Sequence, residues 1–188
     1  MSTVTDVILA STLAATWLAA GLLADTLPTA VTALELRRRA GAVGLLVGLG
    51  AAILVTVPLL GGLLPGASSA PAAALLPAVP ALVVLTATVR RLAQVRAGAG
   101  AIASAPLPPA LRAAAAHPLI GVPLQITGLA AVLGLPIAAR LVPAPGADVT
   151  GVAITLVGVA VLIIGIRAAM RHSRLSLLVL APIGRRRR

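Results

Sequence analysis

The chain contains no cysteine, lysine, phenylalanine, tyrosine or asparagine among its 188 residues. Without cysteine it can form no disulfide, thiolate nucleophile, cysteine-bound zinc site or iron–sulfur cluster. With no tyrosine and a single tryptophan it cannot form the aromatic belt found at many membrane interfaces. Lysine, phenylalanine, tyrosine and asparagine all use AT-rich codons, so their absence indicates a high-GC bacterial genome and explains why every basic residue is arginine.

Charge is scarce as well. Only 10% of the residues are charged, against about a quarter in a typical soluble domain. Hydrophobic residues make up 60% of the chain, and its mean hydropathy is +1.11. So few polar groups cannot coat a soluble globule, and this composition predicts an integral membrane protein.

Five stretches without a charged residue are long enough to cross a bilayer, so the predicted fold is an all-α polytopic helix bundle. The shortest has 18 residues and would be about 27 Å long as a helix. The third is the least regular, because Pro77 and Pro80 interrupt it. The five predicted spans cover 7–24, 41–64, 71–89, 118–139 and 149–166.

The arginines set the predicted orientation. Of 15 arginines, 14 follow spans one, three and five, and only Arg140 lies on the opposite side. Basic loops stay in the cytoplasm, so the N-terminus is expected outside and the C-terminus inside. The expected location is the cell (inner) membrane, with 1–174 as one transmembrane domain. The remainder, 175–188, is a basic cytoplasmic tail, and its apolar part is expected to lie in the membrane interface.

Three arginines directly after span five share one helix face, because Arg167, Arg171 and Arg174 are spaced i, i+4, i+7. We interpret them as membrane-surface anchors whose guanidinium groups reach anionic lipid headgroups. A nucleic-acid partner is not expected, because the chain has no binding motif and no aromatic residues among the arginines.

Small residues recur at helical spacing in two spans. Gly151, Gly158 and Gly165 repeat every seven residues in span five, and Gly44 and Gly48 lie one turn apart in span two. Small residues let helix backbones approach closely in lipid. The two interpretations are packing within the bundle and docking of another subunit or a second copy.

Few polar groups are placed for chemistry. No span contains an ionisable residue, and we expect Asp25 and Glu35 to offset the nearby Arg37–Arg39 cluster. Gln125, with Thr127 beside it, would either bond another helix or line a substrate path. His117 and His172 alone supply too few ligands for zinc or haem, so no metal or cofactor is expected.

The sequence therefore favours a non-catalytic structural or accessory membrane subunit that packs through small-residue helix faces. The first alternative is a small transporter or channel component with its path near the proline-containing spans three and four. The second is a lipid-modifying enzyme, which would need Asp25, Glu35 or His117 to converge at the cytoplasmic face.

The predicted orientation can be tested directly, because the chain has no cysteine of its own. A single cysteine at Ser68 should react with a membrane-impermeant maleimide in intact spheroplasts, and one at Ser104 should react only after lysis. The reverse labelling pattern would overturn the orientation.

Overall fold

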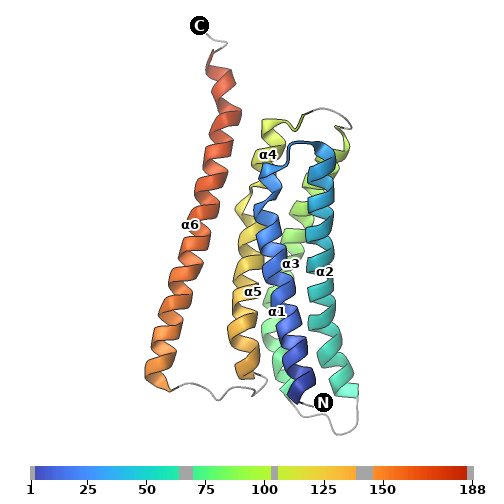
Figure 1. The fold of residues 1–188 in the computed structure, drawn as a ribbon, viewed down its shortest axis with the longest axis vertical. Helices are drawn as coiled ribbons and strands as arrows, with labels where there is room; N and C mark the ends of the chain where they lie inside the picture. The colour runs from blue at the N-terminus through green and yellow to red at the C-terminus, as the bar shows by residue number, and fades with distance from the viewer. Residues whose placement is uncertain (1–2, 64–69, 103–105, 139–145, 186–188) are drawn as a thin grey trace.

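The computed structural model describes residues 3–63, 70–102, 106–138 and 146–185, which form five long helices and one short one (Figure 1). The elements are α1 (Thr3–Asp25), a 3-10 turn (Leu27–Thr29), α2 (Ala33–Leu63), α3 (Ala70–Gly100), α4 (Pro109–Ala115), α5 (Pro118–Ala138) and α6 (Ala147–Arg185). The all-α prediction is confirmed. Arg140, used for the orientation, and the labelling positions Ser68 and Ser104 lie outside the described residues.

The described residues of each predicted span fall within a different long helix; residues 64 and 139, the last of spans two and four, lie outside the described residues. Three of the described segments are long and apolar enough to cross a membrane: Ala33–Thr56 in α2, Pro109–Leu133 through α4 and α5, and Val149–Val179 in α6. These three candidate spans indicate a multi-pass membrane protein. Segment 71–89, the least regular of the predicted spans, lies inside the unbroken helix α3.

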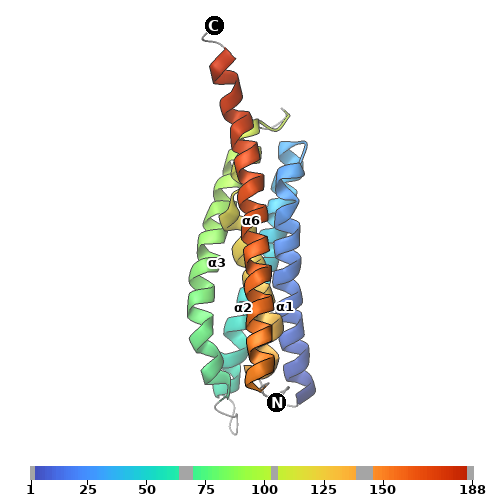
Figure 2. The same cartoon turned by 90° about the vertical axis from the view of Figure 1, so that its left-hand side faces the viewer.

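Helices α1, α2, α3 and α5 lie side by side as a bundle, and α6 runs along its outside and leans away from it toward its own N-terminal end (Figures 1 and 2). The helix α6 has 39 residues and is therefore roughly 58 Å long, about twice the thickness of a bilayer's hydrocarbon core. Its C-terminal end projects past the bundle (Figure 1). Segment 175–184, expected in the membrane interface, is a direct continuation of this helix.

Hydrogen bonds organise the end of the bundle where α1 and α3 finish and α2 and α5 begin. The Thr32 hydroxyl accepts the Glu35 N–H at 3.2 Å, and the Glu35 carboxylate accepts the Val31 N–H at 2.9 Å, which together cap α2. Glu35 also forms an ion pair with Arg39, as expected from the sequence.

The connector between α3 and α5 is held in place by a backbone hydrogen bond. The helix α3 continues to Gly100, and the Leu107 N–H donates to the Val31 carbonyl at 3.2 Å, which ties this connector to the one before α2. The short helix α4 then begins at Pro109 and makes about two turns.

Glycines allow several helices to pack closely. Between α1 and α5 they let the two backbones approach each other. A methyl group at Gly128 would come within 2.9 Å of the Leu18 side chain and 3.0 Å of its backbone nitrogen. Between α1 and α2, the buried indole of Trp17 lies directly against Gly50, so Trp17 fills space between helices. Gly44, predicted for packing, contacts Leu92 of α3, whereas Gly48 faces open space.

A proline in α5 leaves one backbone group that another helix satisfies. Pro123 has no N–H, so the Leu119 carbonyl four residues earlier loses its normal helical donor. The hydroxyl of Thr88 in α3, which is 0% exposed, donates to this carbonyl at 3.1 Å. In lipid such freed carbonyls have to find a partner inside the protein, so this bond also fixes α3 against α5.

We therefore expect Thr88→Val, which keeps the side-chain shape but removes the donor, to lower the free energy of unfolding by about 1–2 kcal/mol. Thermal unfolding in detergent micelles measures the loss. The control is Thr86→Val, because the exposed Thr86 hydroxyl bonds only the Leu82 carbonyl of its own helix. Equal melting temperatures for the two variants would contradict a stabilising role for the bond between helices.

Candidate functional site

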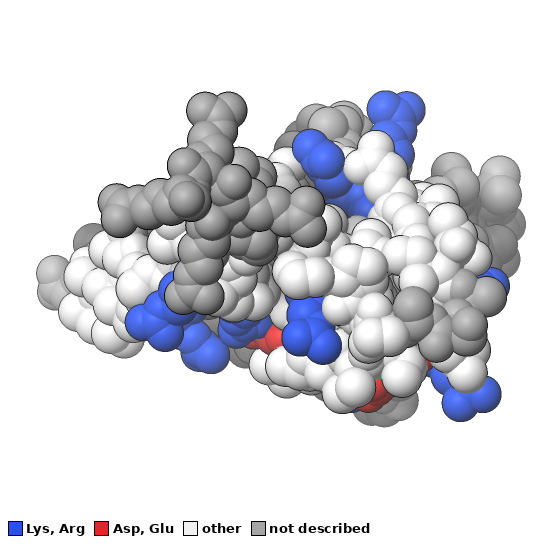
Figure 3. Space-filling model, turned by 90° about the horizontal axis from the view of Figure 1, so that it is seen from above, with Lys and Arg blue, Asp and Glu red and all other residues white. Residues whose placement is uncertain are grey.

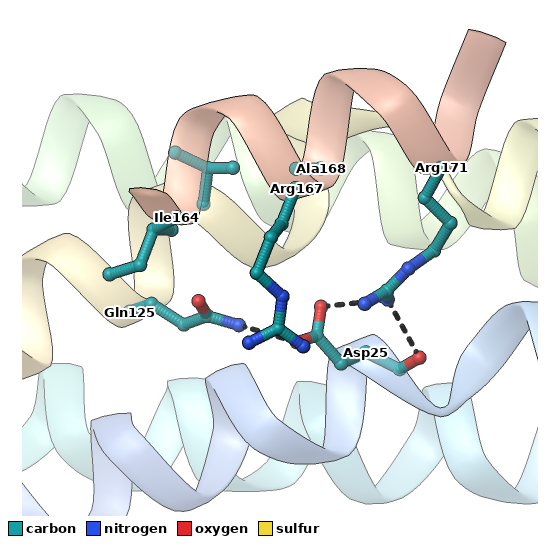
Figure 4. A pocket seen from close by; sticks show the side chains of 7 residues that line it. Asp25, Gln125, Ile164, Arg167, Ala168 and Arg171 are labelled. Carbon is teal, nitrogen blue, oxygen red and sulfur yellow. Dashed lines mark hydrogen bonds and ion pairs between the residues drawn. The ribbon is translucent and has the colours of Figure 1, made fainter. Parts of the chain in front are cut away.

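The candidate site lies where α1, α5 and α6 meet, around Asp25 at the end of α1 (Figure 4). A carboxylate at the C-terminus of a helix is unfavourably placed, because the helix dipole is negative there. Arg171 of α6 offsets this: its guanidinium donates to the Asp25 carboxylate and to the Asp25 backbone carbonyl, both at 3.0 Å. The ion pair is about one-third exposed, with exposed side-chain fractions of 31% for Arg171 and 30% for Asp25.

Gln125 of α5 supplies the second polar contact with Asp25. Its amide nitrogen donates to the second carboxylate oxygen at 2.9 Å and to the Gly21 carbonyl at 3.3 Å. A methyl group at Gly21 would approach the Gln125 side chain to 2.7 Å, so glycine is what lets α5 come this close to α1. Gln125 thus makes the bond to another helix that was one of its two predicted roles.

Thr127, predicted beside Gln125 on a substrate path, makes only local hydrogen bonds. Its hydroxyl donates to the Pro123 carbonyl at 2.7 Å and to the Leu124 carbonyl at 3.2 Å, both in its own helix.

A small recess opens beside these bonds, and Arg167 lies across it (Figure 4). The apolar residues Val122, Ile164 and Ala168 line the recess together with Asp25, Gln125, Arg167 and Arg171. It has room for about one water molecule, far less than a small-molecule site requires. The exposed Arg167 has no hydrogen bond or ion pair with any residue that the structure describes.

The two histidines come together between the residue before α5 and the C-terminal half of α6, because His117 directly precedes α5 and His172 lies within α6. Their rings meet edge to face with centroids 5.0 Å apart. The Nδ1 of His117 accepts the Leu119 N–H at 3.2 Å, and the Nδ1 of His172 lies 3.2 Å from the Ala113 carbonyl. In each ring, Nδ1 thus contacts a backbone group. No cluster of three or more potential metal ligands occurs among the described residues.

The predicted role of Asp25 was wrong. The sequence paired it with the nearby Arg37–Arg39 cluster, but the structure pairs it with Arg171, 146 residues away. Bringing α6 alongside the end of α1 is a tertiary event, so chain proximity alone pointed to the wrong arginine. Of the three predicted membrane-surface anchors, Arg171 is paired with Asp25, whereas Arg167 and Arg174 are exposed and bond no described residue.

The three groups that a lipid-modifying enzyme would need are each engaged elsewhere. Asp25 bonds Arg171, Glu35 bonds Arg39, and His117 bonds the Leu119 N–H beside His172. The arrangement around Asp25 is that of a joint between helices: one carboxylate accepts donors from two other helices and closes the end of its own.

We expect Arg171→Gln to loosen α6, with a loss of about 1–2 kcal/mol of docking free energy. Cysteines at Val122 and Ile164, which line the same recess, report this loss as a reduced yield of disulfide cross-linking between α5 and α6. Arg174→Gln is the matched control, because Arg174 is exposed and unpaired within the described residues. Unchanged cross-linking in Arg171→Gln would show that the ion pair does not hold α6.

Comparisons with protein families, curated proteins and solved structures find no match to this chain. A function has to be inferred from its own residues and their arrangement.

Proposed function

We propose that the chain is a non-catalytic subunit of the bacterial inner membrane that crosses the bilayer five times and packs against a partner through α6. All five predicted spans lie in long helices, and three of the candidate segments meet the length and composition needed to cross a membrane. The two helices without that support, α1 and α3, run alongside the others in the same bundle (Figures 1 and 2).

The distribution of arginine supports an orientation with the C-terminus in the cytoplasm. The arginines of α2 lie near its N-terminal end, those of α3 near its C-terminal end and those of α6 in its C-terminal half, and these parts of the helices lie toward the same end of the molecule (Figure 1). Viewed onto that end, basic side chains of the described residues show at several separate places and acidic ones only in small areas (Figure 3). Positive charge on the cytoplasmic side is the arrangement that membrane insertion favours.

The observation that carries the subunit proposal is the open glycine row of α6. A methyl group built at Gly151, Gly158 or Gly165 would meet no described atom within 4 Å. Gly151 and Gly158 are exposed and Gly165 is partly buried. The side of α6 that faces the bundle is centred elsewhere, on the partly buried Val157, Ile164 and Ala168. The protein therefore leaves unused the surface that is best suited to close helix packing.

In lipid an uncovered glycine row is well suited to another helix. Lipid tails are as apolar as the helix, so hydrophobic burial does not drive association, and close backbone contact at small residues takes its place. Large apolar residues surround the row, with Ile154 67% and Leu162 62% exposed. A transmembrane helix of a partner, or of a second copy, would find both a groove and flanking side chains to pack against.

The test is purification of the tagged protein from its native membrane in mild detergent, followed by mass spectrometry of what co-elutes. A stoichiometric partner or a defined oligomer is expected. A protein that elutes alone as a monomer would contradict the subunit proposal and favour a transporter, with Gln125→Leu as the next variant to assay for flux.

Within that experiment Gly158→Leu should abolish co-elution of the partner while the yield and melting temperature of the protein itself stay unchanged, because no described residue contacts this position. Val157→Leu adds a single carbon to the neighbouring, partly buried residue and should keep the partner. If both variants retain the partner equally, the glycine row is not the interface.

A further inference from the structure

The opposite flank of α6 carries positive charge that the protein does not neutralise. Arg167 and Arg174 lie seven residues apart on this flank, both exposed. Neither has a hydrogen bond or ion pair with any residue in the described part of the chain. Asp25, the carboxylate that lines the recess together with Arg167, already accepts bonds from Arg171 and Gln125.

The recess beside Arg167 brings cationic and apolar surface together. Arg167 and Arg171 lie on one side of it, and Val122, Ile164 and Ala168 supply apolar walls. With Asp25 included, the lining of the recess has one negative and two positive charges, so an approaching group meets net positive charge (Figure 4). An anion at its mouth could interact with Arg167 without displacing any existing hydrogen bond.

Apolar surface continues from this recess along the same flank of α6. Ile163, Leu156 and Val152 lie four, 11 and 15 residues before Arg167, spacings that place them on its side of the helix. They are 51%, 65% and 62% exposed. A cationic end and a long apolar strip are what a molecule with an anionic head and hydrocarbon tails would match.

We infer that this corner between α5 and α6 binds one anionic phospholipid, with its phosphate at Arg167 and Arg174 and its acyl chains along the apolar flank of α6. Basic pockets between membrane helices on the cytoplasmic side are the known setting for such recognition. The inference rests on the proposed membrane orientation. It goes beyond general surface anchoring, in which every exposed arginine at this end would contribute equally.

The experiment reconstitutes the purified full chain into nanodiscs of equal parts phosphatidylglycerol and phosphatidylethanolamine, then releases it into detergent for native mass spectrometry. One retained phosphatidylglycerol per chain is expected. Arg167→Gln should reduce its retention about fivefold, the effect of one arginine near an anionic headgroup. Arg90→Gln is the control, because Arg90 of α3 is exposed at the same end but does not line the recess.

A second variant should act in the opposite direction. Asp25→Asn keeps the side-chain shape, removes the negative charge and leaves Arg171 without its ionic partner, so retention of phosphatidylglycerol should rise. This gain could not come from a merely damaged protein. A fall in retention while cysteines at Val122 and Ile164 still cross-link α5 to α6 would overturn the inference, because it would show that net positive charge does not control binding at an intact site.

Three other outcomes would also overturn it. They are equal losses in Arg167→Gln and Arg90→Gln, equal retention of the two lipids, and full displacement of the lipid by millimolar inorganic phosphate. The first would indicate diffuse surface attraction, and the last a site for free phosphate rather than lipid. Cysteine labelling at positions 68 and 104 in intact spheroplasts reports the orientation separately, so a failed lipid site is distinguishable from a failed membrane topology.

Discussion

The close approach of α1 and α5 is the contact on which the rest of the structure depends. Gly21 and Gly128 remove the side chains that would hold the two helices apart. Only at this separation can Gln125 reach both the Gly21 carbonyl and the Asp25 carboxylate. Asp25 held in this position becomes the acceptor for Arg171, and this ion pair attaches α6 to the bundle. A steric feature of two helices thus sets the place of a third.

Polar contacts between the helices are few, and two of them involve backbone carbonyls at helix irregularities. Thr88 satisfies the carbonyl that Pro123 leaves without a donor, and Arg171 satisfies the last carbonyl of α1. In lipid an unpaired carbonyl costs several kcal/mol, so such groups constrain which helices can be neighbours. Each of these bonds joins segments distant in sequence, which gives the bundle specificity that leucine and alanine packing alone would not supply.

Sequence reasoning predicted the helices well, because the absence of charge over 18 or more residues is a strong signal for a membrane helix. It also found the ion pair between Glu35 and the arginine cluster that follows it, which is a local feature. It did not find the pairing of Asp25 with Arg171 or of His117 with His172, because both depend on where α6 lies. It also could not tell which glycines lie at contacts between helices. Gly21 and Gly128 do, whereas the more regular glycine series in α6 meets no described residue.

The two unused surfaces of α6 are compatible with each other. Gly158 and Arg167 are nine residues apart, which at about 100° per residue places them on opposite sides of the helix. Gly151 and Gly165 are each about 160° around the helix axis from Arg167, so they too lie on the side away from it. A helix packed on the glycine row would therefore leave the arginine flank and its recess open to lipid. With α5 on a third side, α6 can contact its own bundle, a partner and a phospholipid at once. This accounts for so apolar a helix having no buried residue over 149–179.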